Sequence, residues 1–255
     1  MALVKIITDE GVEGHAFLGN ALSALGNDAQ LIIDRFKPML VGLDPLAREK
    51  IYQSMSTWAM GPILRVIGAI DVALWDLAGK AAGIPVHGAI ATGFGCPFEG
   101  DVSLDTIVKI AKRYRDYGFK GVGLGDTTGM ATPPIVTKFV RTLQDAVPEL
   151  DIALHFHNTR GIGLVNVVAG LDEGIEKYDA SFAGIGGCPF APKATGNICT
   201  EDLVYMLDEM GIETGVDIRQ MVELACDVEE TVGRGLPGQV MKAGLRLDLH
   251  EMGDV

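Results

Sequence analysis

The sequence predicts an α/β fold in two parts: a small α+β N-terminal domain, then a partial, half-type TIM β/α barrel. In residues 1–87, two strand-like segments are followed only by helical patterns. From residue 88 onward, short apolar strands alternate with helices, as in a parallel sheet or barrel. Only four clear strands occur there, whereas a closed barrel of this type has eight. We therefore expect domains at residues 1–87 and 88–255.

The composition is that of a soluble globular protein. The chain has 255 residues, of which 48% are hydrophobic and 22% charged. Its formal charge of −13 argues against non-specific nucleic-acid partners and anionic membrane surfaces, although a bound metal could still attract an anionic substrate. The four cysteines show neither zinc-type nor secreted-type spacing. We expect a cytoplasmic protein with no signal peptide and no membrane span.

Local patterns predict the N-terminal elements. Segments 4–7 and 13–17 flank an acidic turn and predict a hairpin. A helix is expected over 27–36, capped by Asn27 and stopped at Lys37-Pro38, and a second over 45–58. The longest helix is expected over 63–82, because its apolar residues recur at three-and-four spacing.

The second part predicts the alternation of a parallel sheet. Strands are expected at 89–92, 121–125, 152–157 and 179–184, with an additional short one near residue 197. Helices are expected to begin near Ser103, Thr132, Leu164, Thr200 and Asp217.

Chemically active side chains fall at the ends of these strands, where parallel β/α folds place their sites: Asp126, His155, His157, Cys188 and Asn197. His155 and His157 are two residues apart, so both imidazoles point to one face of a strand and can share a metal. The alternative is a pair of core histidines satisfied by hydrogen bonds. At a strand end we favour metal binding, by Mg²⁺, Mn²⁺ or a similar divalent ion.

Cys188 lies in a glycine-rich segment, Gly186-Gly187-Cys188-Pro189. Such a loop lets a substrate approach the backbone, and a thiol there can act as a proton donor. The commoner role of a free cysteine is that of a small buried hydrophobe. The glycine-rich setting at a strand end favours the catalytic interpretation.

Residues 1–87 resemble the capping domain of the mandelate racemase branch of the enolase superfamily. The resemblance is carried by segments 8–14 and 40–45, and above all by 69–86, Ala-Ile-Asp-Val-Ala-Leu-Trp-Asp-Leu-Ala-Gly-Lys-Ala-Ala-Gly-Ile-Pro-Val. In that family the cap shapes substrate access to a following barrel. We thus expect a partial enolase-type cap.

From Gly88 onward the chain resembles hydroxymethylglutaryl-CoA lyases. The matching segments are 95–100, 124–129, 155–159, 181–190 and 195–207. The resemblance implies an acyl-CoA substrate and a reaction of leucine degradation, the metal-dependent retro-Claisen cleavage to acetyl-CoA and acetoacetate. It also implies that His155, His157 and Asn197 bind Mg²⁺ or Mn²⁺, that Cys188 is the catalytic thiol, and that Asp126 is a supporting acid/base residue.

The chain departs from that family in its front half. The family has an early Arg-Asp-Gly-Leu-Gln-like motif, which supplies a metal-binding aspartate and a cationic arginine, and this chain has no match to it. The family's early glutamate is also missing. Asn158 stands where the family commonly has an aspartate. Losing such charge stabilisation costs about 10²–10³-fold in rate. Two alternatives stay open: a non-catalytic fusion or truncated barrel that forms a homo-oligomer through open edges, and another aldolase or condensing enzyme of the same superfamily.

Overall fold

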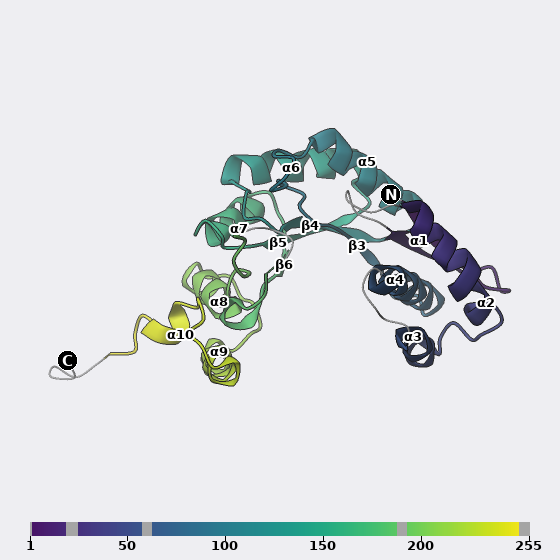
Figure 1. Ribbon diagram of the computed structural model, residues 1–255. Coiled ribbons are helices and arrows are strands. Elements are labelled where there is room, and N and C mark those ends of the chain that lie inside the picture. Colours follow the sequence, from purple (N-terminus) through teal and green to yellow (C-terminus); the bar gives the residue numbers. More distant parts are fainter. Residues whose placement is uncertain (1, 19–24, 58–62, 188–192, 250–255) are drawn as a thin grey trace. The chain divides into compact units, whose positions relative to one another are not determined.

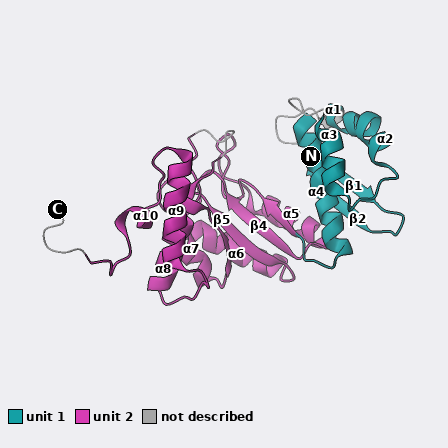
Figure 2. Ribbon diagram, turned by 90° about the horizontal axis from the view of Figure 1, so that it is seen from below, with its two compact units in different colours: residues 1–86 teal, residues 87–255 magenta. Residues whose placement is uncertain are grey.

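The computed structural model describes residues 2–18, 25–57, 63–187 and 193–249. It separates into two compact units, residues 1–86 and 87–255 (Figure 2). The predicted boundary lay one residue later, but His87 belongs to the second unit because it begins strand β3 (His87–Ile90). Among the described residues, no helix combines the length and apolar character needed to cross a membrane.

The first unit packs a hairpin against a long helix. β1 (Ala2–Ile7) and β2 (Glu13–Leu18) pair antiparallel, and β2 lies on α4 (Ile63–Ala81). The core is apolar, with Phe36, Met55, Val66, Ile67 and Ile70 almost completely buried. The predicted hairpin and long helix are therefore confirmed, because their apolar periodicities match the faces that this core buries.

Two shorter predictions in this unit are wrong in detail. Helix α1 (Leu25–Leu31) already contains Asn27, and after a π-helical turn (Ile32–Phe36) the chain continues as α2 (Lys37–Leu40). Pro38 does not stop the helix because it lies in the first turn of α2, where its missing N–H is tolerated. Helix α3 (Arg48–Ser56) begins after the Pro45 turn rather than at it.

The second unit contains a parallel sheet of four strands in the order β3-β4-β5-β6, with β4 (Gly121–Asp126), β5 (Asp151–Phe156) and β6 (Lys177–Asp179). Its connecting helices are α5 (Leu104–Asp116), α6 (Pro133–Ala146) and α7 (Gly163–Asp172); α5 and α6 lie on the same side of the sheet (Figure 1). Four parallel strands with crossover helices make a partial barrel, as predicted.

The two faces of the sheet differ in character. Val122, Leu124, Ile152 and Leu154 pair side by side and are buried, so they form the face packed against helices. The alternate residues are small or polar: glycines 121, 123 and 125, with Ala153 and His155 beside them. His155 therefore projects from the face of the sheet on which its neighbours are small.

The last predicted strand is misplaced. β6 ends at Asp179, and residues Phe182–Gly184 form a 3₁₀ turn in which Ala183 has a φ of 49°. The segment at Asn197 is paired through single bridges, His157 with Asn197 and Ser181 with Cys199, so it joins the ends of β5 and β6 without forming a full strand. This segment is followed by α8 (Thr200–Glu209), α9 (Ile218–Val232) and α10 (Val240–Ala243). Asp217 caps α9, as predicted, by accepting from two backbone amides.

Candidate metal centre

The two predicted histidines lie side by side at the carboxyl end of β5. Their ring centroids are 5.2 Å apart at an interplanar angle of 59°. The His155 side chain is 32% exposed, whereas His157 is buried. One imidazole is thus partly exposed on the small-residue side of the sheet, while its neighbour is buried.

A backbone carbonyl determines which nitrogen of His157 is free. Nδ1 of His157 lies 2.9 Å from the carbonyl oxygen of Thr195. Because that oxygen can only accept, Nδ1 carries the proton, and in the neutral ring Nε2 keeps its lone pair. This tautomer is the one a metal ligand needs.

The amide of Asn197 is oriented just as firmly. Its Nδ2 donates to the carbonyl oxygen of Ile185 at 3.0 Å and to Oγ of Ser181 at 3.1 Å. The carbonyl cannot donate, so the nitrogen must face it. Oδ1 is then buried and forms no hydrogen bond of normal geometry, although the Asn197 side chain interacts with the ring of His155. A buried oxygen without a partner is costly, and a cation would satisfy it.

Close glycine contacts bring this amide into place. A Cβ on Gly186 would lie 2.6 Å from Nδ2 of Asn197, and one on Gly196 would lie 1.9 Å from the carbonyl oxygen of Gly184. The backbone at residues 184–186 therefore passes so close to Gly196 that neither side has space for a side chain. This close approach explains the glycines at positions 186 and 196.

The local electrostatics favour a neutral His155. Burial lowers its pKa, as does the charge of His157, while Asp179 and the side chain of Asn197 favour the protonated form. A neutral imidazole is the form that binds a metal. Oδ2 of Asp179 lies 3.7 Å from Nδ1 of His155.

Asp126 occupies a different register position from the histidine pair, and its Oδ2 is buried without a hydrogen-bond partner. It pairs in register with Phe156, on the helix-packed face, whereas His155 is the register partner of Gly125. Its Oδ1 accepts from the backbone amides of Met130 (2.7 Å) and Ala131 (3.1 Å), so it holds the loop after β4. Burial raises the pKa of Asp126 to about 6. Val122, Leu124 and Asp126 share one parity, and that alternation could have shown from the sequence that this carboxyl points toward the helices.

Cys188 lies outside the described residues. The segment leading to it, 181–187, is fastened by Glu201 in the first turn of α8, whose Oε2 accepts from the backbone amide of Ala183 at 3.0 Å. Glu201 is buried, and burial raises its pKa. Sequence reasoning missed both Glu201 and Asp179, because neither position lies in a local pattern that reveals its partner.

The donors at the site fit part of a metal coordination shell. No three His, Cys, Asp or Glu side chains gather around one ion position in the part of the chain that the structure describes. The donors are instead two imidazoles and one amide oxygen, of which the unpartnered Oδ1 of Asn197 is the strongest indication of a ligand. Three neutral donors leave positions open for substrate oxygens and suit a catalytic site better than a closed structural one.

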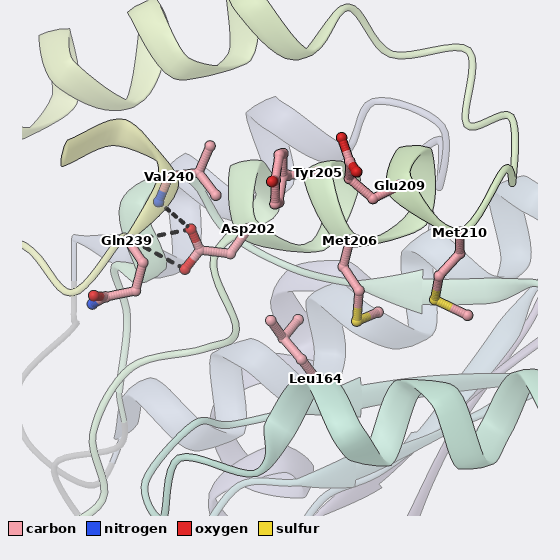
Figure 3. A pocket seen from close by; sticks show the side chains of 8 residues that line it. All are labelled: Leu164, Asp202, Tyr205, Met206, Glu209, Met210, Gln239 and Val240. Atoms are coloured by element: carbon pink, nitrogen blue, oxygen red, sulfur yellow. Dashed lines mark hydrogen bonds between the residues drawn. The ribbon is translucent and has the colours of Figure 1, made fainter. Parts of the chain in front are cut away.

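A separate groove of about 490 Å³ lies at the helices rather than at the strand ends. It is lined by residues of α7, α8 and α10, with Leu164, Met206 and Met210 among them (Figure 3). The carboxylate of Asp202 at its edge accepts from the backbone amides of Gln239 and Val240 and so joins α10 to α8. Of the residues described as lining this groove, none is a predicted site residue.

Known proteins match the two parts of the chain separately. Residues 1–90 match the family described as the mandelate racemase / muconate lactonizing enzyme N-terminal domain, which supports the N-terminal resemblance. The (R)-citramalyl-CoA lyase of Chloroflexus aurantiacus is 44% identical over 175 residues, 69% of this chain and 55% of that protein. The hydroxymethylglutaryl-CoA lyase YngG of Bacillus subtilis is 40% identical over 63% of this chain and 54% of its own length.

A solved structure shows the same resemblance to hydroxymethylglutaryl-CoA lyases. An HMG-CoA lyase from Acinetobacter baumannii, in complex with coenzyme A and 3-methylmalate, superposes with a TM-score of 0.65 at 40% identity, covering 72% of this chain and 61% of that one. The chain spans about half the length of the curated relatives it matches. Residues 75–228, more than half of the chain, match the family described as HMGL-like, and the chain therefore belongs to that family.

Proposed function

We propose that this chain is a divalent-metal-dependent carbon–carbon lyase of the hydroxymethylglutaryl-CoA lyase type. The observation that carries the proposal is the buried, unpartnered Oδ1 of Asn197 beside the histidine pair. His155, His157 and Asn197 would hold Mg²⁺ or Mn²⁺. When bound, such an ion would supply positive charge that favours transfer of a proton from the substrate's tertiary hydroxyl to solvent water.

The protein's own groups would then direct a retro-Claisen cleavage. The bond between the hydroxyl-bearing carbon and the thioester's α-carbon breaks, releasing acetoacetate and leaving the enolate of acetyl-CoA. The thiol of Cys188 would donate the proton that converts this enolate into acetyl-CoA. Asp126 would hold the loop after β4 by accepting hydrogen bonds from the backbone amides of Met130 and Ala131.

The proposed acyl-CoA substrate is supported by the related proteins. The Chloroflexus relative is a citramalyl-CoA lyase, and the Acinetobacter structure holds coenzyme A. Hydroxymethylglutaryl-CoA and citramalyl-CoA share a tertiary hydroxyl placed β to the thioester carbonyl, so one site can cleave either.

The test is acetyl-CoA release from each thioester by the purified chain with Mn²⁺, with Cys188→Ala as the control. We expect release above the control, which should be slower by about 10²–10⁴-fold. Release from neither thioester above that control would overturn the proposal. Activity with citramalyl-CoA alone would reassign the substrate.

A second candidate is a non-catalytic half-barrel that forms a homo-oligomer. It is favoured by the sheet itself, which ends in the edge strands β3 and β6 within the described residues. Edge strands expose backbone groups that can pair with another chain. Light scattering after size-exclusion chromatography tests this, since a stable monomer at micromolar concentration would contradict it. Catalysis and association are separate measurements, so each candidate can fail independently.

A further inference from the structure

We propose that Glu201 is a positioning residue: its carboxylate holds the turn of residues 181–185 and, through this turn, the orientation of the Asn197 amide. The inference rests on the proposed metal site, in which Asn197 is a ligand, but the contacts that carry it join residues of this chain alone. Glu201 lies in the first turn of α8 and is completely buried.

The backbone of the turn is strained at Ala183. This residue has a φ of 49° and a ψ of 17°, in the left-handed region that a residue with a Cβ rarely adopts. Such a conformation costs free energy and persists where the surrounding structure holds it. Glu201 holds it directly, because its Oε2 accepts from the backbone amide of Ala183 at 3.0 Å. Ala183 is itself buried, so loss of this acceptor would leave its amide without that bond away from water.

Both partners of this hydrogen bond are fixed by packing. A Cβ on Gly238 would collide with Oε1 of Glu201, so the carboxylate lies directly against the backbone there. Ala183 belongs to a buried cluster that includes Leu236 and Met241. The carboxylate therefore has little freedom to move away from the turn.

The turn carries the two acceptors that orient Asn197. It is closed by the backbone amide of Gly184, which donates to the carbonyl oxygen of Ser181 at 3.0 Å. The carbonyl oxygen of Ile185 and Oγ of Ser181 both accept from Nδ2 of Asn197. Oγ of Ser181 also donates to the Ile185 carbonyl. Ala183 lies between these two acceptors in the chain, so a change in its backbone angles moves one relative to the other.

Two conservative substitutions separate the reach of the Glu201 side chain from its charge. Glu201→Gln keeps the length, and its amide oxygen can still accept from Ala183. Glu201→Asp keeps the charge but is shorter by one methylene group, which withdraws the carboxylate from the Ala183 amide. If Glu201 acts through this hydrogen bond, Glu201→Gln should behave like the wild type and Glu201→Asp like Glu201→Ala. A role of the negative charge itself would reverse this order.

The first experiment reads the hold on Asn197 in the metal-free protein. In ¹⁵N-asparagine-labelled protein, NMR measures how fast the Nδ2 protons of Asn197 exchange with solvent, and the absence of this signal in Asn197→Ala assigns it. Protons in buried hydrogen bonds exchange slowly, and local opening speeds their exchange. We expect slow exchange in the wild type and Glu201→Gln, and faster exchange in Glu201→Asp and Glu201→Ala. Equal exchange rates in the wild type and Glu201→Asp would overturn the inference.

The second experiment measures Mn²⁺ affinity by the paramagnetic resonance of free Mn²⁺. Glu201→Asp should bind about 10–100-fold more weakly than the wild type, and Glu201→Gln should bind equally well. Asp76→Ala is the control for lost stability, because Asp76 is a buried carboxylate of the first unit, and its Mn²⁺ affinity should match that of the wild type. An equal loss in Asp76→Ala and Glu201→Asp would contradict the inference. If the wild type binds no Mn²⁺, the exchange rates still decide whether Glu201 positions Asn197, while the proposed metal function fails.

Discussion

Nδ2 of Asn197 donates to the carbonyl oxygen of Ile185 at 3.0 Å, and this bond leaves Oδ1 of the same amide buried without a partner. The polypeptide thereby presents an amide oxygen next to two imidazoles. Residues from the turn after β6 thus determine the orientation of a donor that lies beside the end of β5.

Replacing Asn197 with alanine should abolish this donor. We expect Mn²⁺ affinity to fall at least about 10-fold, and the free energy of unfolding to fall by about 1–2 kcal/mol because the Ile185 carbonyl loses its donor. Isothermal titration with Mn²⁺ and urea unfolding measure the two effects. Ser181→Ala is the control: it removes one acceptor of Nδ2 but keeps Oδ1 free, so its Mn²⁺ affinity should change less. Equal losses in the two variants would contradict the ligand role of Asn197.

Gly196→Ala should disrupt the site through the backbone. The added Cβ would lie 1.9 Å from the carbonyl oxygen of Gly184, a contact that only a backbone shift can relieve. We expect a loss of about 2–4 kcal/mol in the free energy of unfolding, with weaker Mn²⁺ binding. Gly235→Ala is the matched control, because a Cβ there meets nothing within 4 Å. A stability of Gly196→Ala close to that of the wild type would contradict the close approach of Gly196 to the Gly184 carbonyl.

Asp126 should make stability depend on pH in a predictable direction. Its folded-state pKa of about 6 is above the ordinary 3.8, because burial disfavours the charged form. The folded protein therefore binds this proton more tightly than the unfolded chain. The stability that it contributes is fully present below about pH 4 and is lost as the pH rises through 6.

Asp126→Asn should remove that dependence. Its asparagine Oδ1 can still accept from the loop amides, so its stability relative to the wild type should rise between pH 4 and pH 8, by at most about 3 kcal/mol. Urea unfolding at several pH values checks this, with the exposed Asp145→Asn as control. A constant difference between variant and wild type over that range would argue against a raised pKa.

Asp76 should be essential to the first unit. It is buried, and its Oδ2 accepts from the backbone amide of His15 and from Nζ of Lys80, each at 2.7 Å. Asp76→Ala would leave both donors without this acceptor, and we expect a loss of about 3–5 kcal/mol in stability. Differential scanning calorimetry of the full chain would show it, with the exposed Asp9→Ala expected to change little. A thermal profile equal to that of the wild type would contradict the role.

Local patterns predicted much of the fold. The hairpin, the long helix α4 and the amphipathic α5 and α6 follow from apolar spacing within each segment, and the structure shows all four. The incorrect predictions concern segments whose conformation depends on residues distant in the chain. Residues 179–184 looked like a strand, but the pairing with β5 ends at Asp179, and the chain then turns to cross Gly196.

The sequence by itself determined the order of the elements, the histidine pair with its two-residue spacing, and the need for glycine around Cys188, because these depend on near neighbours in the chain. Only the tertiary structure decided that Asn197 presents an unpartnered oxygen and that Asp179 lies opposite His155. Each of these depends on strand register or on hydrogen bonds between residues 12 or more positions apart, and no local pattern encodes such contacts.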